Sequence, residues 1–154
     1  MSKHRPRMLP LFMLGVSLLS CGYFSSGQWE DDPKNLKRAW GYSKPWESLV
    51  VHSSYWRSPH WTREESYFFQ FRGNDELLKQ MIDSNKLRPR LASQPALLPN
   101  TAFCRDKPAW FLPKPFDRYD VWECPDAPTP DWPPSCLLFK EKTSNDLFLY
   151  ACQL

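Results

Sequence analysis

The alternation of apolar and polar residues is clearest at residues 64–72 (EESYFFQFR), which are rich in aromatic residues. Phe68 falls on one face of an extended chain, and the opposite face receives Tyr67, Phe69 and Phe71. Successive side chains of a β-strand point to opposite faces of the sheet. We therefore predict a strand at this position, with aromatic residues on both of its faces.

Directly after this strand the spacing of the apolar residues becomes helical. Asn74 is a good N-cap residue, and Asp75 and Glu76 carry negative charge into the first turn of the predicted helix. Asn85 is a suitable residue to end this helix. The apolar stripe of this helix consists of Leu77, Leu78, Met81 and Ile82.

The remaining elements are shorter. Asp32-Pro33 opens a short helix and Gly41 ends it. Residues 56–61 (WRSPHW) read as a kinked link because they contain Pro59. Further strands are expected at residues 47–55, near 118–124, at 136–142 and at 146–152, the last two forming a hairpin around Thr143-Ser144-Asn145.

Proline changes the character of the segment between residues 89 and 134, which holds 11 of the 16 prolines. A long helix is excluded there, and a continuous sheet is disfavoured. The same segment carries several large aromatic residues, which a flexible linker does not need. We expect an ordered loop packed on the core. The predicted fold class is α+β: one domain over residues 29–154, with a small antiparallel sheet of about five strands and one main helix.

The N-terminus reads as an export signal. Residues 1–7 are cationic, and Met8 to Leu19 form an apolar stretch that is too short to span a membrane. Leu18-Leu19-Ser20-Cys21 resembles the lipobox of bacterial lipoproteins. The resemblance implies that residues 1–20 are removed, that Cys21 receives lipid, and that residues 21–28 are a short tether. Gly22 stands where an aspartate tends to retain such proteins in the inner membrane. The implied location is therefore the cell envelope, at the periplasmic face of the outer membrane.

The net charge of +3 belongs to the expected signal. Removing Lys3, Arg5 and Arg7 from the 20 basic residues leaves 17, which equals the number of acidic residues. A balanced surface gives no general attraction to nucleic acid, so we expect no nucleic-acid partner.

The segment of residues 52–61 is the best candidate for a binding site, because it gathers both histidines of the mature chain with an arginine and aromatic residues. Its possible binding residues are His52, Trp56, Arg57, His60 and Trp61. Two histidines match no metal-ligand pattern, and no cofactor motif is present, so we expect neither metal nor cofactor. No nucleophile elbow of the Gly-x-Ser-x-Gly type occurs. Packed tryptophans and ordinary hydrogen-bonded histidines explain the same residues without any site.

Four cysteines follow Cys21 and allow three disulfide pairings; they are Cys104, Cys124, Cys136 and Cys152. A three-residue turn centred on Ser144 places Cys136 opposite Cys152 in the predicted hairpin. This register favours a Cys136–Cys152 disulfide and leaves Cys104–Cys124 as the second bond. A two-residue turn instead moves Cys136 opposite Gln153.

Three functions remain open from the sequence. The first is a non-enzymatic envelope lipoprotein that binds another protein or the cell wall, as an accessory or inhibitor-type module, and we favour it. The second is a small envelope hydrolase that uses His52 or His60. The third is a carbohydrate or cell-wall binder, which requires Trp56, Trp61, Trp110 and Trp132 to lie exposed in one row.

Overall fold

A computed structural model of the chain describes residues 26–41, 45–59, 64–90, 107–112, 114–125 and 136–153. These residues form one antiparallel sheet in the order β1-β2-β3-β7-β6-β5-β4, with two α-helices, α2 (Asn35–Trp40) and α3 (Asp75–Asn85). The predicted α+β class and antiparallel sheet are confirmed. The described part contains seven strands and two helices, where the sequence predicted about five strands and one main helix.

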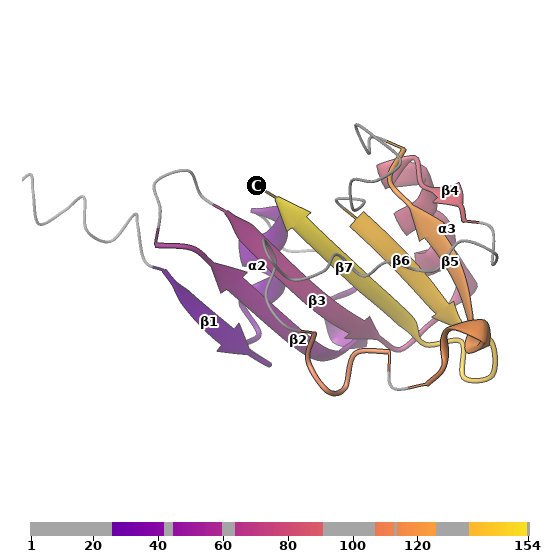
Figure 1. Ribbon diagram of the computed structural model, residues 1–154, viewed down its shortest axis with the longest axis horizontal. Helices are drawn as coiled ribbons and strands as arrows, with labels where there is room; N and C mark the ends of the chain where they lie inside the picture. Colours follow the sequence, from indigo (N-terminus) through magenta and orange to yellow (C-terminus); the bar gives the residue numbers. More distant parts are fainter. Residues whose placement is uncertain are drawn as a thin grey trace, which may run out of the picture.

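The sheet is built from two meanders joined by α3 (Figure 1). The first meander comprises β1 (Gly27–Glu30), β2 (Val50–Arg57) and β3 (Glu65–Phe71). The second runs back from the far edge through β4 (Arg88–Pro89), β5 (Tyr119–Glu123), β6 (Cys136–Glu141) and β7 (Leu147–Gln153), so that β7 pairs with β3. Short 3₁₀ helices, η1 (Glu47–Leu49) and η2 (Phe116–Arg118), precede β2 and β5. Within the described residues, no helix is long and apolar enough to cross a membrane.

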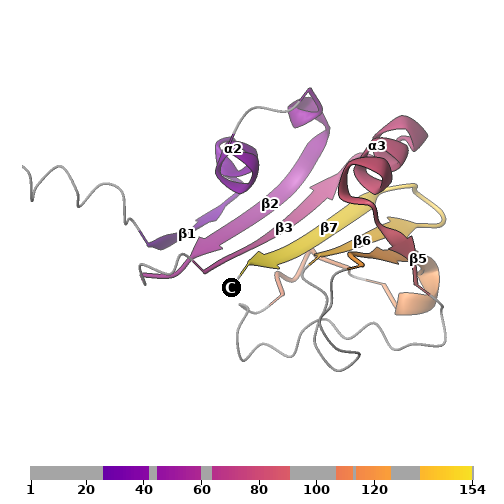
Figure 2. The ribbon, with the colours of Figure 1, turned by 90° about the horizontal axis from the view of Figure 1, so that it is seen from above.

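Both helices lie on one face of the sheet (Figure 2), and the core is therefore divided into two layers. The helix-side layer contains Phe69 and Phe71 of β3, packed against residues of α2 and α3 such as Leu36 and Met81. On the opposite face, Phe68 packs against Phe111 of the proline-rich segment, with the ring centroids 4.9 Å apart. The two faces of the β3 sequence are thus used as predicted. The predicted packing of the proline-rich loop on the core is confirmed for residues 107–112, whereas most of the rest of that loop lies outside the described residues.

The predicted helices are confirmed with small shifts at their ends. Asn74 caps α3, because its side chain accepts a 2.6 Å hydrogen bond from the amide of Leu77. α3 ends at Asn85 as predicted, and Lys86 follows as the C-cap in the left-handed conformation at φ 52°. α2 begins at Asn35, two residues after Pro33, and ends at Gly41 as expected.

Two short edge strands were not predicted, and β2 differs from its prediction. β1 takes Gly27 and Gln28 out of the expected tether and pairs them with Arg57 and Trp56. β2 begins at Val50, after η1, and continues through Arg57, into residues assigned from the sequence to a kinked link. β2 has a partner on each side, so backbone hydrogen bonds favour the extended chain until Pro59.

The register of the β6–β7 hairpin differs by one residue from the prediction. Lys140 pairs with Leu147 and Cys136 pairs with Ala151, so a four-residue loop, residues 142–145, connects Glu141 and Asp146. Asn145 adopts the left-handed conformation at φ 62°. The carboxylate of Glu141 is buried beneath this loop, where it accepts hydrogen bonds from the amide of Ser144 and from Lys114. The spacing of residues in the sequence does not reveal that the Glu141 side chain stabilises this loop.

The buried Glu141 carboxylate makes stability depend on pH. Its hydrogen bonds from the side chain and amide of Ser144, and then from Lys114, lower its pKa from 4.5 to about 2. A carboxyl group whose pKa is lower in the folded than in the unfolded protein stabilises the fold above the unfolded value. We therefore expect this contribution to disappear as the pH falls from 4.5 to about 2. Unfolding in denaturant should show Glu141→Gln less stable than wild type at neutral pH and equal to it at the acid end of this range. A constant difference at all pH values would contradict the assignment.

Candidate functional site

A cluster of polar contacts lies where β1 ends beside β2. Asp31 follows β1 in the left-handed conformation at φ 48°, which aspartate tolerates better than most residues. Its amide donates to the carbonyl of Ser53 over 2.7 Å. Its carboxylate accepts a 2.8 Å hydrogen bond from the amide of Ser53. Asp31 thereby continues the β1–β2 ladder with its own side chain.

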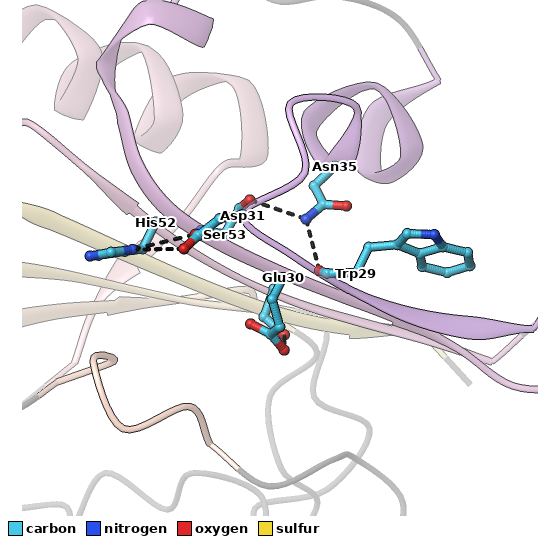
Figure 3. Close-up of polar contacts among 7 residues, drawn as sticks. Trp29, Glu30, Asp31, Asn35, His52 and Ser53 are labelled. Carbon is cyan, nitrogen blue, oxygen red and sulfur yellow. Dashed lines mark hydrogen bonds and ion pairs between the residues drawn. The ribbon is translucent and has the colours of Figure 1, made fainter.

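The same carboxylate contacts His52, with His52 Nδ1 lying 3.2 and 3.3 Å from the two oxygens of Asp31 (Figure 3). The other large neighbour of the imidazole is Trp110, whose ring stacks on it at 5.4 Å with an interplanar angle of 25°. The histidine side chain remains 41% exposed. His52 is therefore oriented by a carboxylate and an aromatic ring while still accessible to solvent.

A buried asparagine fixes α2 to these strands. Asn35 is fully buried, and its amide nitrogen donates to the carbonyl of Trp29 over 2.9 Å and to Ser53 Oγ over 3.1 Å (Figure 3). Its side-chain oxygen accepts a 2.7 Å hydrogen bond from Arg38. Arg38 also lies over the ring of Trp29 and binds Asp32 over 2.9 Å. The hydrogen bond from Arg38, followed by that from the amide of Lys34, lowers the pKa of Asp32.

A hollow of about 250 Å³ lies between the start of α2, η1 and the beginning of β2. Its buried lining is mainly apolar and includes Leu36 and Phe69, which are 2% and 0% exposed. Three carboxylates line its more exposed part, namely those of Asp31, Asp32 and Glu47. Val51 also lines it and is 43% exposed, one of two large hydrophobic residues exposed to this degree in the described chain. The hollow therefore combines an apolar base with an anionic rim.

The predicted binding segment does not converge on one site. His52 and Trp56 lie on the face of β2 opposite the helices, because they alternate in step with Phe68 of β3, whereas Arg57 points to the other face. His60 and Trp61 lie outside the described residues. Sequence reasoning missed Asp31, Asn35 and Glu47. Asp31 and Asn35 lie 21 and 17 positions before His52, and Glu47 was assigned to the expected strand at residues 47–55. The acidic pair Asp31-Asp32 before Pro33 was the available signal, but only Asp32 was interpreted from the sequence, as the start of a helix.

The described residues do not assemble a hydrolase site around His52. Ser53 Oγ accepts a hydrogen bond from Asn35, and Ser54 Oγ donates to Glu30 over 2.8 Å. Among the described residues there is also no group of three or more histidine, cysteine, aspartate or glutamate residues placed to hold a metal ion. The expectation of no bound metal stays a prediction.

The tryptophan row required for carbohydrate binding is not formed by the described tryptophans. Trp56 and Trp110 are each partly buried, and Trp110 is engaged with His52 and Phe111. Trp61 and Trp132 lie outside the described residues.

The predicted Cys136–Cys152 pairing is wrong. The four-residue loop places Cys136 opposite Ala151, so Cys152 belongs to the other face of the sheet, opposite Ser66. Cys136 instead lies beside Cys124, and both are thiols rather than halves of a disulfide. The expected Cys104–Cys124 bond is not formed in this structure either, because Cys124 is a thiol. Cys104 lies outside the described residues.

Comparisons of the chain with models of protein families, with curated proteins and with solved structures gave no match.

Proposed function

We propose that this chain is a lipid-anchored protein of the bacterial envelope whose folded part binds another envelope protein. The anchor is proposed from the lipobox-like Leu18–Cys21 at the end of an export signal, with lipid on Cys21. Gly22 favours the periplasmic face of the outer membrane. Two or three acyl chains make release from a membrane very slow, whereas one gives only marginal binding.

The anchor would keep one edge of the sheet close to the membrane. Only residues 22–26 separate Cys21 from the first residue of β1, Gly27. An extended chain of this length spans at most about 20 Å. β1 is the edge strand at one end of the sheet (Figure 1), and the hollow opens beside the residues that follow it. A binding surface at this position suits a partner that is also held at the membrane.

The observation that supports protein binding best is the chemistry of the hollow. Its apolar base, with Leu36 and Phe69, can pack against the methylene stem of a lysine or arginine. The carboxylates at its rim can accept hydrogen bonds from the cationic end. Asp31 and Asp32 are already bound to His52 and Arg38, so Glu47 is the carboxylate most available to an incoming charge. We infer that a basic side chain of the partner occupies the hollow.

We expect charge reversal at Glu47 to weaken the complex. Val51 replaced by a photoreactive amino acid should crosslink the partner in intact envelopes, and Glu47→Lys should reduce the yield at least tenfold, which corresponds to about 1.4 kcal/mol. Peptide mapping should place the crosslink next to a lysine or arginine of the partner. Glu76→Lys, on the exposed start of α3, is the matched control and should leave the yield unchanged. Equal yields in the wild type and Glu47→Lys would contradict the proposal.

One observation favours a hydrolase as a second candidate, namely the contact between Asp31 and His52 Nδ1. A carboxylate at Nδ1 is how hydrolases orient a general-base histidine. A nucleophile would then have to meet Nε2, and both neighbouring serine hydroxyls bind elsewhere. An enzyme of this kind should lose its activity in His52→Ala and retain photocrosslinking at position 51, which separates the two functions.

A further inference from the structure

Cys124 and Cys136 are cross-strand neighbours at the end of the β5–β6 ladder. The register pairs Glu123 with Leu137, and the amide of Cys124 donates to the carbonyl of Cys136 over 3.1 Å, which places the two cysteines directly opposite each other. Directly opposed residues of antiparallel strands project from the same face. Both cysteines pack against the helix-side core layer, and both are partly buried.

This spacing fits a disulfide. Opposed residues that are linked by a ladder hydrogen bond have α-carbons about 5.5 Å apart, and disulfides most often join α-carbons about 5.5–6 Å apart. The two thiols are already in hydrogen-bond contact, and this contact, together with burial, raises the pKa of the Cys136 thiol.

A bond from either cysteine to Cys152 is excluded by the faces of the sheet. Cys136 lies opposite Ala151, and the neighbouring Cys152 alternates to the opposite face, where it packs against the second core layer. A bond from Cys136 to Cys152 would have to pass through the sheet. The β5–β6 register makes Cys124 the partner of Cys136.

We propose that Cys124 and Cys136 are oxidised to a disulfide that closes residues 125–135 into a loop. The oxidant is a protein disulfide of a thiol–disulfide oxidoreductase in the compartment to which the chain is exported, so the reaction in the cell rests on the export part of the proposed function. One thiol, as its thiolate, attacks the oxidant's disulfide, and the second thiol then displaces the oxidant from the mixed disulfide. Both protons and two electrons leave the pair, and the oxidant is released as a dithiol. The bond joins β5 to β6 where the chain leaves the sheet.

The purified full chain tests the geometry directly. After reduction and then oxidation with glutathione disulfide, trypsin should release residues 119–140, which lack an internal lysine or arginine, two hydrogens lighter than the reduced peptide. Cleavage at Asp126 and Asp131 should release the segment between them and leave the two cysteine-containing pieces joined until a reductant is added. Cys136→Ala should make Cys124 reactive towards an alkylating agent. Alkylation of both cysteines in the oxidised wild type, or a bond from either to Cys104 or Cys152, would overturn the proposal.

A second arm separates this inference from export. Cells are lysed in an alkylating agent, so that thiols present in the cell are blocked before the same digestion. Joined peptides support both the disulfide and export. Alkylated cysteines in cells, with joined peptides after oxidation of the purified chain, would support the pairing and contradict export to an oxidising compartment.

Discussion

Gly73→Ala should be among the most destabilising single substitutions in this protein. Gly73 connects β3 to α3, and a methyl group at its α-carbon would lie 1.6 Å from the carbonyl oxygen of Asn145 in the β6–β7 loop. Both atoms belong to or are attached directly to backbone, so one of the two segments must move. We expect a loss of roughly 3 kcal/mol or more in the free energy of unfolding, at or above the upper end of the usual cost of overpacking. Denaturant unfolding followed by tryptophan fluorescence measures it.

Gly41→Ala is the matched control. Gly41 has φ 73°, but nothing lies within 4 Å of the position that its β-carbon would take. Only the left-handed conformation is then strained, at a cost of about 1 kcal/mol. A loss in Gly73→Ala no larger than that in Gly41→Ala would contradict the close approach of the two loops.

The second large effect should come from Phe111→Ala. Phe111 is 0% exposed although it belongs to the proline-rich segment, and it packs edge-to-face on Phe148 at 5.7 Å and on Phe68 at 4.9 Å. Removing a buried phenylalanine side chain costs about 3–5 kcal/mol. We expect a loss in this range, because this one ring covers the centre of the sheet face opposite the helices.

Phe116→Ala tests whether burial, rather than aromatic character, sets that cost. Phe116 comes from the same segment but is 44% exposed, with its ring 6.3 Å from that of Phe139. We expect a loss below about 1 kcal/mol for a side chain that keeps much of its hydration when folded. Equal stability of Phe111→Ala and Phe116→Ala would contradict the packing of residues 107–112 on the sheet.

The sequence predicts best where local signals agree with one another. The strand at 65–71 and the helix at 75–85 carry an apolar period, a capping asparagine and acidic residues in the first turn, and all of these are observed. The edge strands β1 and β4 carry no such signals. Gly27 and Gln28 suit a tether equally well, and they become a strand only because β2 offers a partner.

The hairpin register could not be settled from spacing, because loops of two, three and four residues are all compatible with it. The four-residue loop is stabilised by the buried Glu141 and by Asn145 in the left-handed conformation. The register therefore shifts by one residue, and each β6 residue faces a β7 residue whose side chain was predicted to lie on the other face of the sheet. The shift places Ala151 rather than Cys152 opposite Cys136. The separate β5–β6 register places Cys124 on the other side of Cys136.

The candidate site is formed by residues that are far apart in the sequence. His52 was singled out from its sequence neighbours, but its actual partners are Asp31 and Trp110, which lie 21 and 58 positions away along the chain. The hollow likewise depends on how α2 and η1 approach β2. Tertiary packing determines both the partners of His52 and the shape of the hollow, and no local sequence pattern predicts either.

Metabolic labelling of cells with a clickable fatty acid tests the central claim most directly, which is that the chain is anchored by lipid on Cys21. We expect the wild-type protein to carry the label and to sediment with membranes. Cys21→Ala should lose the label while keeping the fold, since Cys21 precedes the first strand. A wild-type protein that is unlabelled and remains soluble after cell fractionation would contradict the account.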